Sequence, residues 1–375
     1  MKKILGILCF VFYFVLTRLV RVLLVLFDKK GPLDVAFISN FRDEEDVRRF
    51  GFWNAEDLPD VLPWIRYVWQ GKYKTQLFMI GSLTEGITGD RATAESLNSA
   101  IKQFEEAVKI AVEKGARVIL LAASTKRFPM EKLKEKYPNV IFTIGDNFTG
   151  LLLEEGIEKV FERTGINLKK SRVLVIAPYG FLGNIALNYL LSLGVEVVGL
   201  GNIKRRDLFQ KKYGIKLHTS FKDVGTVDLV VACNSATSSQ LIAKRVELLR
   251  IYGKKLVVVD PCEPSCMPQN LFKDSEDKVL RFDACNGYSP KLACPLEPIT
   301  PWLLRLLKGN IWGCCAEALI ISANAELGKK DWLKVNKENM EILRKFLGNG
   351  LGQFSLPPLC CFNKAVKDFT LFETE

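Results

Sequence analysis

Several features that mark specialised proteins are missing from this 375-residue sequence. No arginine-rich tract with interleaved aromatic residues concentrates its formal net charge of +11. This argues against nucleic acid as a partner and favours phosphate-bearing cofactors, acidic carrier proteins or anionic lipid head groups. The ten cysteines are spread thinly and include the adjacent pairs Cys314–Cys315 and Cys360–Cys361, so we expect no disulfide framework and a reducing compartment. The only histidine, His218, lies far along the chain from Cys314, and we expect a structural role for it.

The first thirty residues differ in character from the rest of the chain. Two apolar runs, Ile4–Leu16 and Val22–Phe27, are separated by a stretch that carries Arg18 and Arg21. No small-residue cleavage site follows the apolar core, which argues against a secretory signal, and two internal arginines argue against a simple spanning helix. We expect residues 1–32 to form an uncleaved membrane-associated helix that contacts membrane lipid, with the rest of the chain on the cytoplasmic side. A buried core helix is the alternative.

Strands are expected to alternate with helices between Leu33 and Gly165, with no internal repeat or low-complexity linker. The expected strands are Asp34–Ser39, Gln76–Ser82, Arg117–Ala122 and Val140–Ile144. The expected helices are Ala92–Lys114, Met130–Glu135 and Leu151–Arg163. This alternation predicts an α/β substrate domain over residues 33–166, with its boundary within Asn167–Lys170.

The stretch Ser171–Gly194 has the pattern of a βαβ unit that opens a dinucleotide-binding domain. A β-branched run is followed by a glycine-containing turn and then by apolar residues at helical spacing, and a second strand is expected at Val195–Leu200. The first turn of such a unit holds a pyrophosphate at a helix N-terminus. A glycine turn in an ordinary α/β protein is the alternative. The residues expected to contact the cofactor here are Ala177, Gly180, Phe181, Leu182 and Gly183, with alanine in place of the usual first glycine.

The alternation continues and completes a Rossmann-like domain expected over residues 167–300. Its further elements are a strand at Asp228–Cys233, a helix at Ala236–Leu249 and a strand at Lys255–Asp260. Because ligands of this fold lie across the carboxyl ends of the strands, we expect three more residues at the cofactor site. They are Asn234, Ser235 and Asp260.

The segment after the second strand of this domain bears on the choice of cofactor. An NAD enzyme presents an acid there to the ribose 2′-hydroxyl, whereas this chain has Lys204, Arg205 and Arg206 and no acid near Gly201. A basic cluster suits a 2′-phosphate, so we expect NADPH rather than NADH. A solvated basic helix start is the alternative.

A cysteine pair opens the helical run Trp312–Leu319. A cysteine near a helix N-terminus has a lowered thiol pKa and is a better nucleophile. Packing as a small hydrophobic residue is the alternative for Cys314 and Cys315.

Taken together, several stretches resemble the long-chain fatty acyl carrier protein reductases, the aldehyde-forming enzymes known from cyanobacteria. They are residues 312–356, beginning WGCCAEAL; residues 142–183, from FTIGDNF to APYGFLG; and VDLVVACNSAT followed by VVVDPCEPSCMPQNL. The resemblance covers roughly residues 34–356. It implies a substrate domain, an NADPH-binding Rossmann domain and a helical carboxyl end, here residues 301–375. The family's Cys-x-Ala-Glu-Ala sequence places the catalytic cysteine at Cys314, whereas the apolar amino terminus and Ala177 depart from the family pattern.

The activity implied is NADPH-dependent reduction of a long-chain acyl thioester, carried by acyl carrier protein or coenzyme A, to a fatty aldehyde through an acyl group on Cys314. Glu317, one turn on, would complement the helix end. Two alternatives remain. One is another NADP-dependent oxidoreductase of Rossmann fold acting on a small substrate, and the other is a membrane-anchored binding protein with a degenerate Rossmann domain. A four-thiolate metal site is a weaker possibility, although its spacing is not the usual C-x-x-C; its members would be Cys262, Cys266, Cys285 and Cys294.

Overall fold

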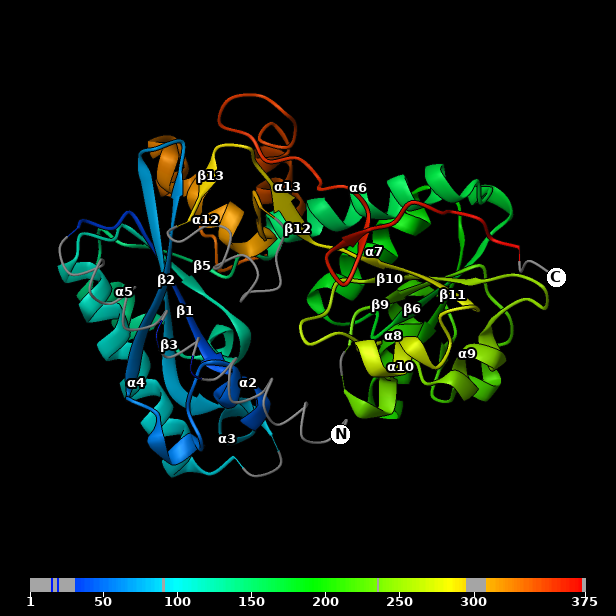
Figure 1. Cartoon of the computed structure of the whole chain (residues 1–375), viewed down its shortest axis with the longest axis horizontal. Coiled ribbons are helices and arrows are strands. Elements are labelled where there is room, and N and C mark those ends of the chain that lie inside the picture. Colours follow the sequence, from blue (N-terminus) through cyan, green and yellow to red (C-terminus); the bar gives the residue numbers. More distant parts are fainter. Residues whose placement is uncertain are drawn as a thin grey trace. The chain divides into compact units, whose positions relative to one another are not determined.

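The computed structural model describes residues 15, 19, 31–89, 92–234, 236–294 and 308–372 (Figure 1). They form two compact units. Unit 1 contains the described residues up to Gly145 together with Ser289–Gln353, and unit 2 contains Asp146–Tyr288 together with the described residues from Phe354 onward. Each unit has its own six-stranded sheet with helices, so the expected α/β class is confirmed.

The predicted membrane-associated helix of residues 1–32 lies almost wholly outside the described residues. Within the described ranges, no helix has the length and apolar character needed to cross a bilayer.

Unit 1 is built on a mixed sheet with the strand order β13-β2-β3-β1-β4-β5. Its central strand β1 runs parallel to β3 and β4, whereas β2 runs antiparallel to both β3 and β13. The strands are β1 Val35–Phe41, β2 Val61–Trp69, β3 Tyr73–Leu83, β4 Val118–Leu121, β5 Ile141–Thr143 and β13 Leu292–Ala293. The helices are α2 Glu44–Arg49, α3 Thr84–Thr88, α4 Ala94–Glu113, α5 Glu131–Lys136, α12 Gly313–Ala323 and α13 Lys337–Arg344.

Alternation along the strands decides which helix covers which face of this sheet. Ile38, Phe78 and Ile119 share one face, where they pack against the apolar side of α4. The Thr143 side chain points to the opposite face, where its hydroxyl donates a hydrogen bond to Glu317 of α12. Figure 1 shows α4 running along the sheet. The sheet of unit 1 is therefore covered on both faces, and the helix that carries the cysteine pair is one of the covers.

Unit 2 is built on a fully parallel sheet with the order β11-β10-β9-β6-β7-β8. Counted along this unit, the order is the 3-2-1-4-5-6 arrangement of the Rossmann fold. The strands are β6 Arg172–Ile176, β7 Glu196–Leu200, β8 Leu217–His218, β9 Leu229–Ala232, β10 Leu256–Asp260 and β11 Val279–Asp283. The helices are α6 Asp146–Thr164, α7 Phe181–Ser192, α8 Arg206–Tyr213, α9 Ala243–Leu249 and α10 Gln269–Lys273. Short strands elsewhere are β12 Asn286–Tyr288, β14 Asn310–Trp312, β15 Cys360–Cys361 and β16 Lys364–Ala365.

Both faces of the parallel sheet are buried, which is why its strands are almost continuous apolar runs. Helices α6 and α7 cover one face, where Ile157 and Leu187 pack with Val175 of β6. The other face holds Leu174 of β6 together with Val246 of α9. The sheet therefore presents only its edges and its strand ends to solvent.

The observed division of the chain differs from the predicted domains 33–166, 167–300 and 301–375. Helix α6 belongs to unit 2, because its apolar side packs on α7 and β6 rather than on the first sheet. Ser289–Gln353 returns to unit 1 through β13 and α12, and the last described residues rejoin unit 2. The carboxyl end is therefore not a separate helical region. The predicted helix at Ala236–Leu249 is also shorter, since α9 begins at Ala243.

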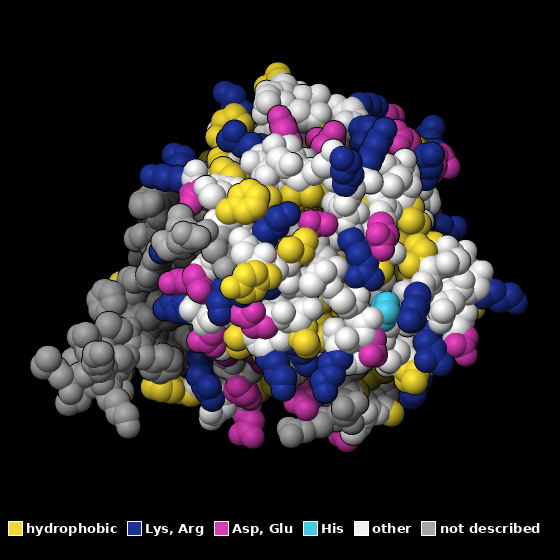
Figure 2. Space-filling model, turned by 90° about the vertical axis from the view of Figure 1, so that its right-hand side faces the viewer, with side chains coloured by type: hydrophobic (Ala, Val, Ile, Leu, Met, Phe, Trp, Pro, Cys, Tyr) yellow, Lys and Arg dark blue, Asp and Glu magenta, His cyan; other side chains and the backbone are white. Residues whose placement is uncertain are grey.

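Charge on the surface agrees with the absence of a basic tract in the sequence. Figure 2 shows one face on which Lys and Arg side chains are interspersed with Asp and Glu, with apolar side chains scattered among them. The positive charge is therefore not gathered into one patch on that face.

Candidate functional site

The glycine turn lies at the carboxyl end of β6, beside β9, where the strand order of unit 2 reverses. Ala177 has φ 54°, a left-handed conformation that costs an alanine about 1 kcal/mol. Its carbonyl accepts the Gly180 N–H at 3.1 Å. A Cβ on Gly183 would lie 2.2 Å from the Ala177 carbonyl oxygen. Glycine is therefore required at 183 by close backbone contact, whereas the first position of the motif tolerates alanine.

Helix α7 begins directly after Gly180, which caps it with an extended backbone and no side-chain hydrogen bond. The N–H groups of Phe181, Leu182 and Gly183 form the first turn and have no partner within the helix. Together with the helix dipole they make this end suited to an anion. The five residues predicted from the motif thus lie in one turn, at an end of α7 that is suited to an anion.

Tyr179 is a residue of this turn that the sequence reasoning missed. Its ring lies against Gly201, where an added Cβ would be 2.5 Å from a ring carbon. Its hydroxyl accepts the Asn202 N–H at 2.9 Å. Tyr179 therefore reaches from the end of β6 to the end of β7, the position next to which a dinucleotide ribose is held. Its place inside the motif was the only signal in the sequence.

The basic cluster Lys204–Arg206 follows β7, as expected, and all three side chains are exposed. The Asn202 side chain accepts the Lys204 N–H at 2.9 Å and so caps the short turn that presents the cluster. Arg206 pairs with Asp207 at 3.4 Å, an exposed contact of little strength. Neither Lys204 nor Arg205 forms a salt bridge with another described residue. The cluster is therefore available to an anion beside the end of β7.

Asn234 lies at the end of β9, at the predicted rim of the sheet. Its amide donates to the Ser239 hydroxyl at 2.9 Å, and its carbonyl accepts the Ala236 N–H at 3.1 Å. Ser235, also predicted for the cofactor site, lies outside the described residues. Asn234 thus shapes the loop after β9 through contacts with its own neighbours.

Asp260 is the last residue of β10, at the same rim, but its carboxylate is buried and bonds to other residues of unit 2. It pairs with buried Arg281 at 3.2 Å and accepts the Ser265 hydroxyl. It also accepts three backbone N–H groups of the following loop, those of Cys262, Cys266 and Met267. Asp260 therefore has a structural role rather than the predicted contact with the cofactor. Removing its carboxylate would leave the buried Arg281 with one partner fewer.

The two adjacent thiols of α12 lie in different environments. Cys314 is the second residue of the helix and is half-buried, whereas Cys315 is 1% exposed. Burial raises the pKa of the Cys315 thiol well above its ordinary value, and the neighbouring Cys314 adds to the shift. Cys315 is therefore a protonated core residue, and Cys314 is the accessible member of the pair.

The start of α12 is anchored to the end of β5. A Cβ on Gly145, which has φ 73°, would lie 2.2 Å from the Cys314 Cβ. The Gly145 N–H donates to Thr143 Oγ1 at 3.0 Å, and the Thr143 hydroxyl donates to Glu317 Oε1 at 2.6 Å. Glu317 is fully buried, so it does more than complement the helix end. It holds the helix that carries Cys314 in register with the sheet of unit 1.

The weaker possibility of a metal site is not supported where the structure can test it. In the described parts of the chain, no group of three or more His, Cys, Asp and Glu side chains is arranged to hold a metal ion. Cys262 and Cys266 donate instead to the carbonyl oxygens of Ala232 and Ser239. Burial raises the pKa of Cys266 to about 12, so this thiol is protonated at neutral pH.

His218 ends β8 and is buried. Its carbonyl accepts the Gly201 N–H at 2.9 Å. Burial, followed by Lys216 and Arg172, lowers the pKa of its imidazole. These features agree with the structural role expected from the sequence.

Among the comparisons with known proteins, only the comparison with solved structures found similar proteins. No family model matches the sequence, and no curated protein matches it. The chain is similar to L-tryptophan dehydrogenase from Nostoc punctiforme, with 12% identity over 83% of this chain and 78% of that chain and a TM-score of 0.41. It is similar to the dipicolinate synthase A chain from Bacillus subtilis, with 14% identity over 68% and 89% and a TM-score of 0.33. It is also similar to shikimate dehydrogenase from Aquifex aeolicus, with 13% identity over 67% and 86% and a TM-score of 0.33. The identification of unit 2 as a Rossmann domain rests on its own strand order and glycine turn.

Proposed function

We propose that this protein reduces a long-chain acyl thioester, carried by acyl carrier protein or coenzyme A, to a fatty aldehyde with NADPH. The acyl group would pass through a thioester on Cys314. The observation that carries this proposal is the contrast between the two thiols of α12, one accessible at a helix start and one buried. It agrees with the residue that the family resemblance singles out.

The cofactor half of the proposal is supported by how well unit 2 suits a dinucleotide. The first turn of α7 offers backbone N–H groups to a pyrophosphate, and Gly183 allows that turn to close. The basic cluster Lys204–Arg206 stands where a 2′-phosphate would need cations. The ring of Tyr179 lies beside the same strand end, in reach of the adenosine half of a dinucleotide. These features favour NADPH over NADH.

The chemistry assigned to Cys314 is acyl transfer. Its sulfur attacks the thioester carbonyl, the bond from that carbonyl to the carrier sulfur breaks, and the carrier leaves as a thiol with the proton that Cys314 gave up. One thioester replaces another, so the step is close to neutral in free energy. NADPH, when bound, supplies the hydride that reduces this acyl group. Breaking the bond between Cys314 and the reduced carbon then releases the aldehyde, and a proton from the solvent restores the Cys314 thiol.

The start of α12 supports both steps. Its first N–H groups and the positive end of its dipole stabilise a thiolate at Cys314 and the oxyanion that develops on the carbonyl. The Gly145–Thr143–Glu317 chain of hydrogen bonds keeps this helix end in place. Glu317 is thereby a positioning residue rather than a proton donor to the substrate.

The adjacent thiols allow the proposal to be tested with a matched pair of variants. The full chain is incubated with palmitoyl-coenzyme A and examined by intact mass, and aldehyde formation is then measured with NADPH. Cys314→Ala should lose both the acyl adduct and the aldehyde while it still binds NADPH. Cys315→Ala should keep both, because the Cys315 thiol is buried and protonated.

Two outcomes would count against this assignment. An adduct that maps to Cys315, or one that survives in Cys314→Ala, would show a different nucleophile. NADPH binding without any adduct would favour a Rossmann oxidoreductase that acts on a small substrate, with Cys314 as a packing residue.

A further inference from the structure

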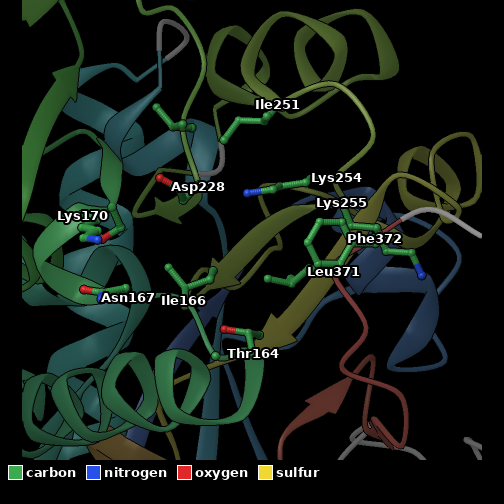
Figure 3. A pocket seen from close by; sticks show the side chains of 13 residues that line it. Thr164, Ile166, Asn167, Lys170, Asp228, Ile251, Lys254, Lys255, Leu371 and Phe372 are labelled. Carbon is green, nitrogen blue, oxygen red and sulfur yellow. The ribbon is translucent and has the colours of Figure 1, made fainter.

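A pocket of about 320 Å³ opens in unit 2 at the amino ends of the parallel strands (Figure 3). Its walls include Ser171, Asp228 and Lys255, which directly precede β6, β9 and β10. The glycine turn lies at the carboxyl ends of the same strands. This pocket is therefore separate from the candidate cofactor site and lies on the opposite edge of the sheet.

The last described residues of the chain close one side of the pocket. The Lys255 N–H donates to the Leu371 carbonyl at 2.7 Å, and Lys254 pairs with Phe372 in an isolated antiparallel bridge. The Lys254 ammonium lies 5.7 Å from the centre of the Phe372 ring. Ile166 and Ile251 add apolar surface on the other walls. The pocket thus has apolar residues in its lining, and one of its sides is held in place by backbone hydrogen bonds to the end of the chain.

The charge of the lining is one-sided. Three lysines line the pocket against a single acid, Asp228, whose carboxylate already accepts the Arg172 N–H at 2.9 Å. None of the three, which are Lys170, Lys254 and Lys255, forms a salt bridge with another described residue. In Figure 3 the amine of Lys254 and the carboxylate of Asp228 extend into the same space from facing walls. Among the residues that line the pocket, lysines therefore outnumber acids by two, and Lys254 is the lysine whose amine extends into the pocket.

We propose that this pocket binds a small amphipathic anion, a carboxylate or phosphate group attached to an aromatic or short aliphatic body. Lys254 binds the anionic group, and Phe372 with Leu371 and Ile251 surrounds the body. The volume lies at the low end of the range for small-molecule pockets, which suits such a ligand rather than a dinucleotide. Lys254 and Lys255 are half-buried, and a lysine partly shielded from water binds an anion more strongly than a fully exposed one.

The ligand class can be tested by calorimetry on the full chain with four probes. Phenyl phosphate and 4-phenylbutyrate are the amphipathic anions, inorganic phosphate lacks the apolar body, and 4-phenylbutanol lacks the charge. At least one amphipathic anion should bind saturably with a Kd of about 1 mM or below, and both controls should bind about tenfold more weakly or worse. The stronger of the two anions identifies the anionic group.

Variants of one lysine then locate the site. Lys254→Gln should weaken binding about tenfold or more, and Lys254→Arg should restore it. Lys222→Gln, an exposed lysine of the same unit outside the pocket, serves as the matched control and should bind like the wild type. Absence of saturable binding by either anion, equal binding by the neutral alcohol, or unchanged binding in Lys254→Gln would overturn the proposal. NADPH affinity is measured in parallel, so failure here is distinguishable from failure of the cofactor site.

Discussion

Replacing Gly145 with alanine should displace the start of α12 and with it Cys314. The new Cβ would lie 2.2 Å from the Cys314 Cβ and 2.4 Å from its Cα. These are atoms close to the backbone, so a change of rotamer cannot relieve the contact, and the two elements must move apart by about 1.2 Å to reach an ordinary distance. Gly145 also has φ 73°, a conformation that is unfavourable for alanine.

These two effects set the expected loss of stability. The left-handed conformation costs alanine about 1 kcal/mol net, after allowing for the smaller entropy of the unfolded chain. The overlap adds about 1–3 kcal/mol. The free energy of unfolding of unit 1 should therefore fall by about 2–4 kcal/mol. Because a shift of about 1 Å at a reacting group can cost about 100-fold in rate, transfer of the acyl group to Cys314 should slow to a similar degree.

Gly71→Ala separates the overlap from the backbone effect. Gly71 lies in the turn between β2 and β3 of the same unit, has φ 68°, and has open space where a Cβ would be placed. It should lose only about 1 kcal/mol and keep acyl transfer.

The free energy of unfolding is measured by urea titration, with tryptophan fluorescence as the signal. The five tryptophans among the described residues all lie in unit 1, so their fluorescence reports on the unfolding of this unit. Equal losses of stability in Gly145→Ala and Gly71→Ala would refute the inference that α12 starts against Gly145.

Three further predictions concern unit 2. Replacing the basic cluster Lys204–Arg206 with alanines should weaken NADPH binding about tenfold or more and leave NADH binding unchanged, as measured by calorimetry; equal effects on both would contradict a 2′-phosphate contact. Gly183→Ala should abolish NADPH binding because its Cβ would lie 2.2 Å from the Ala177 carbonyl, whereas Gly194→Ala, at φ 73° with open space, should keep it. The lowered pKa of His218 means that the unfolded state binds a proton first as the pH falls. The free energy of unfolding should therefore decrease below about pH 6.5, and His218→Gln should flatten that slope; an unchanged slope would show that other groups cause it.

Local sequence signals were enough for the elements that surround the candidate sites. The β-branched run Arg172–Ala177 and the apolar run Val195–Leu200 were predicted as strands, and the observed strands β6 and β7 agree with them to within one residue. Helix α4 was predicted to within two residues at each end, because its apolar positions recur at helical spacing. The antiparallel strand β2 was missed, since most of its inward and outward positions are apolar and no alternation marks it.

Contacts between residues far apart in the sequence decided the rest. The periodicity of α6 showed a helix, but only packing showed that it covers the sheet of unit 2. The sequence predicted Asp260 at a strand end, but only the fold showed that its carboxylate pairs with Arg281 and accepts hydrogen bonds from the loop after β10. Likewise, neither spacing nor composition indicates that Gly145 lies against Cys314, 169 positions later in the numbering.

The sequence by itself thus determined the strands, helices and glycine turn of the Rossmann unit, the basic cluster beside it, and the cysteine at a helix start. These features depend on residues within one or two turns of each other, whose backbone preferences and apolar spacing are local. The tertiary structure alone decided the division into units and the lysine-lined pocket at the amino ends of the strands. Those features depend on which surfaces pack together when the chain folds. The free energy of that packing is a sum over residues that are far apart in the sequence, so no local sequence pattern predicts it.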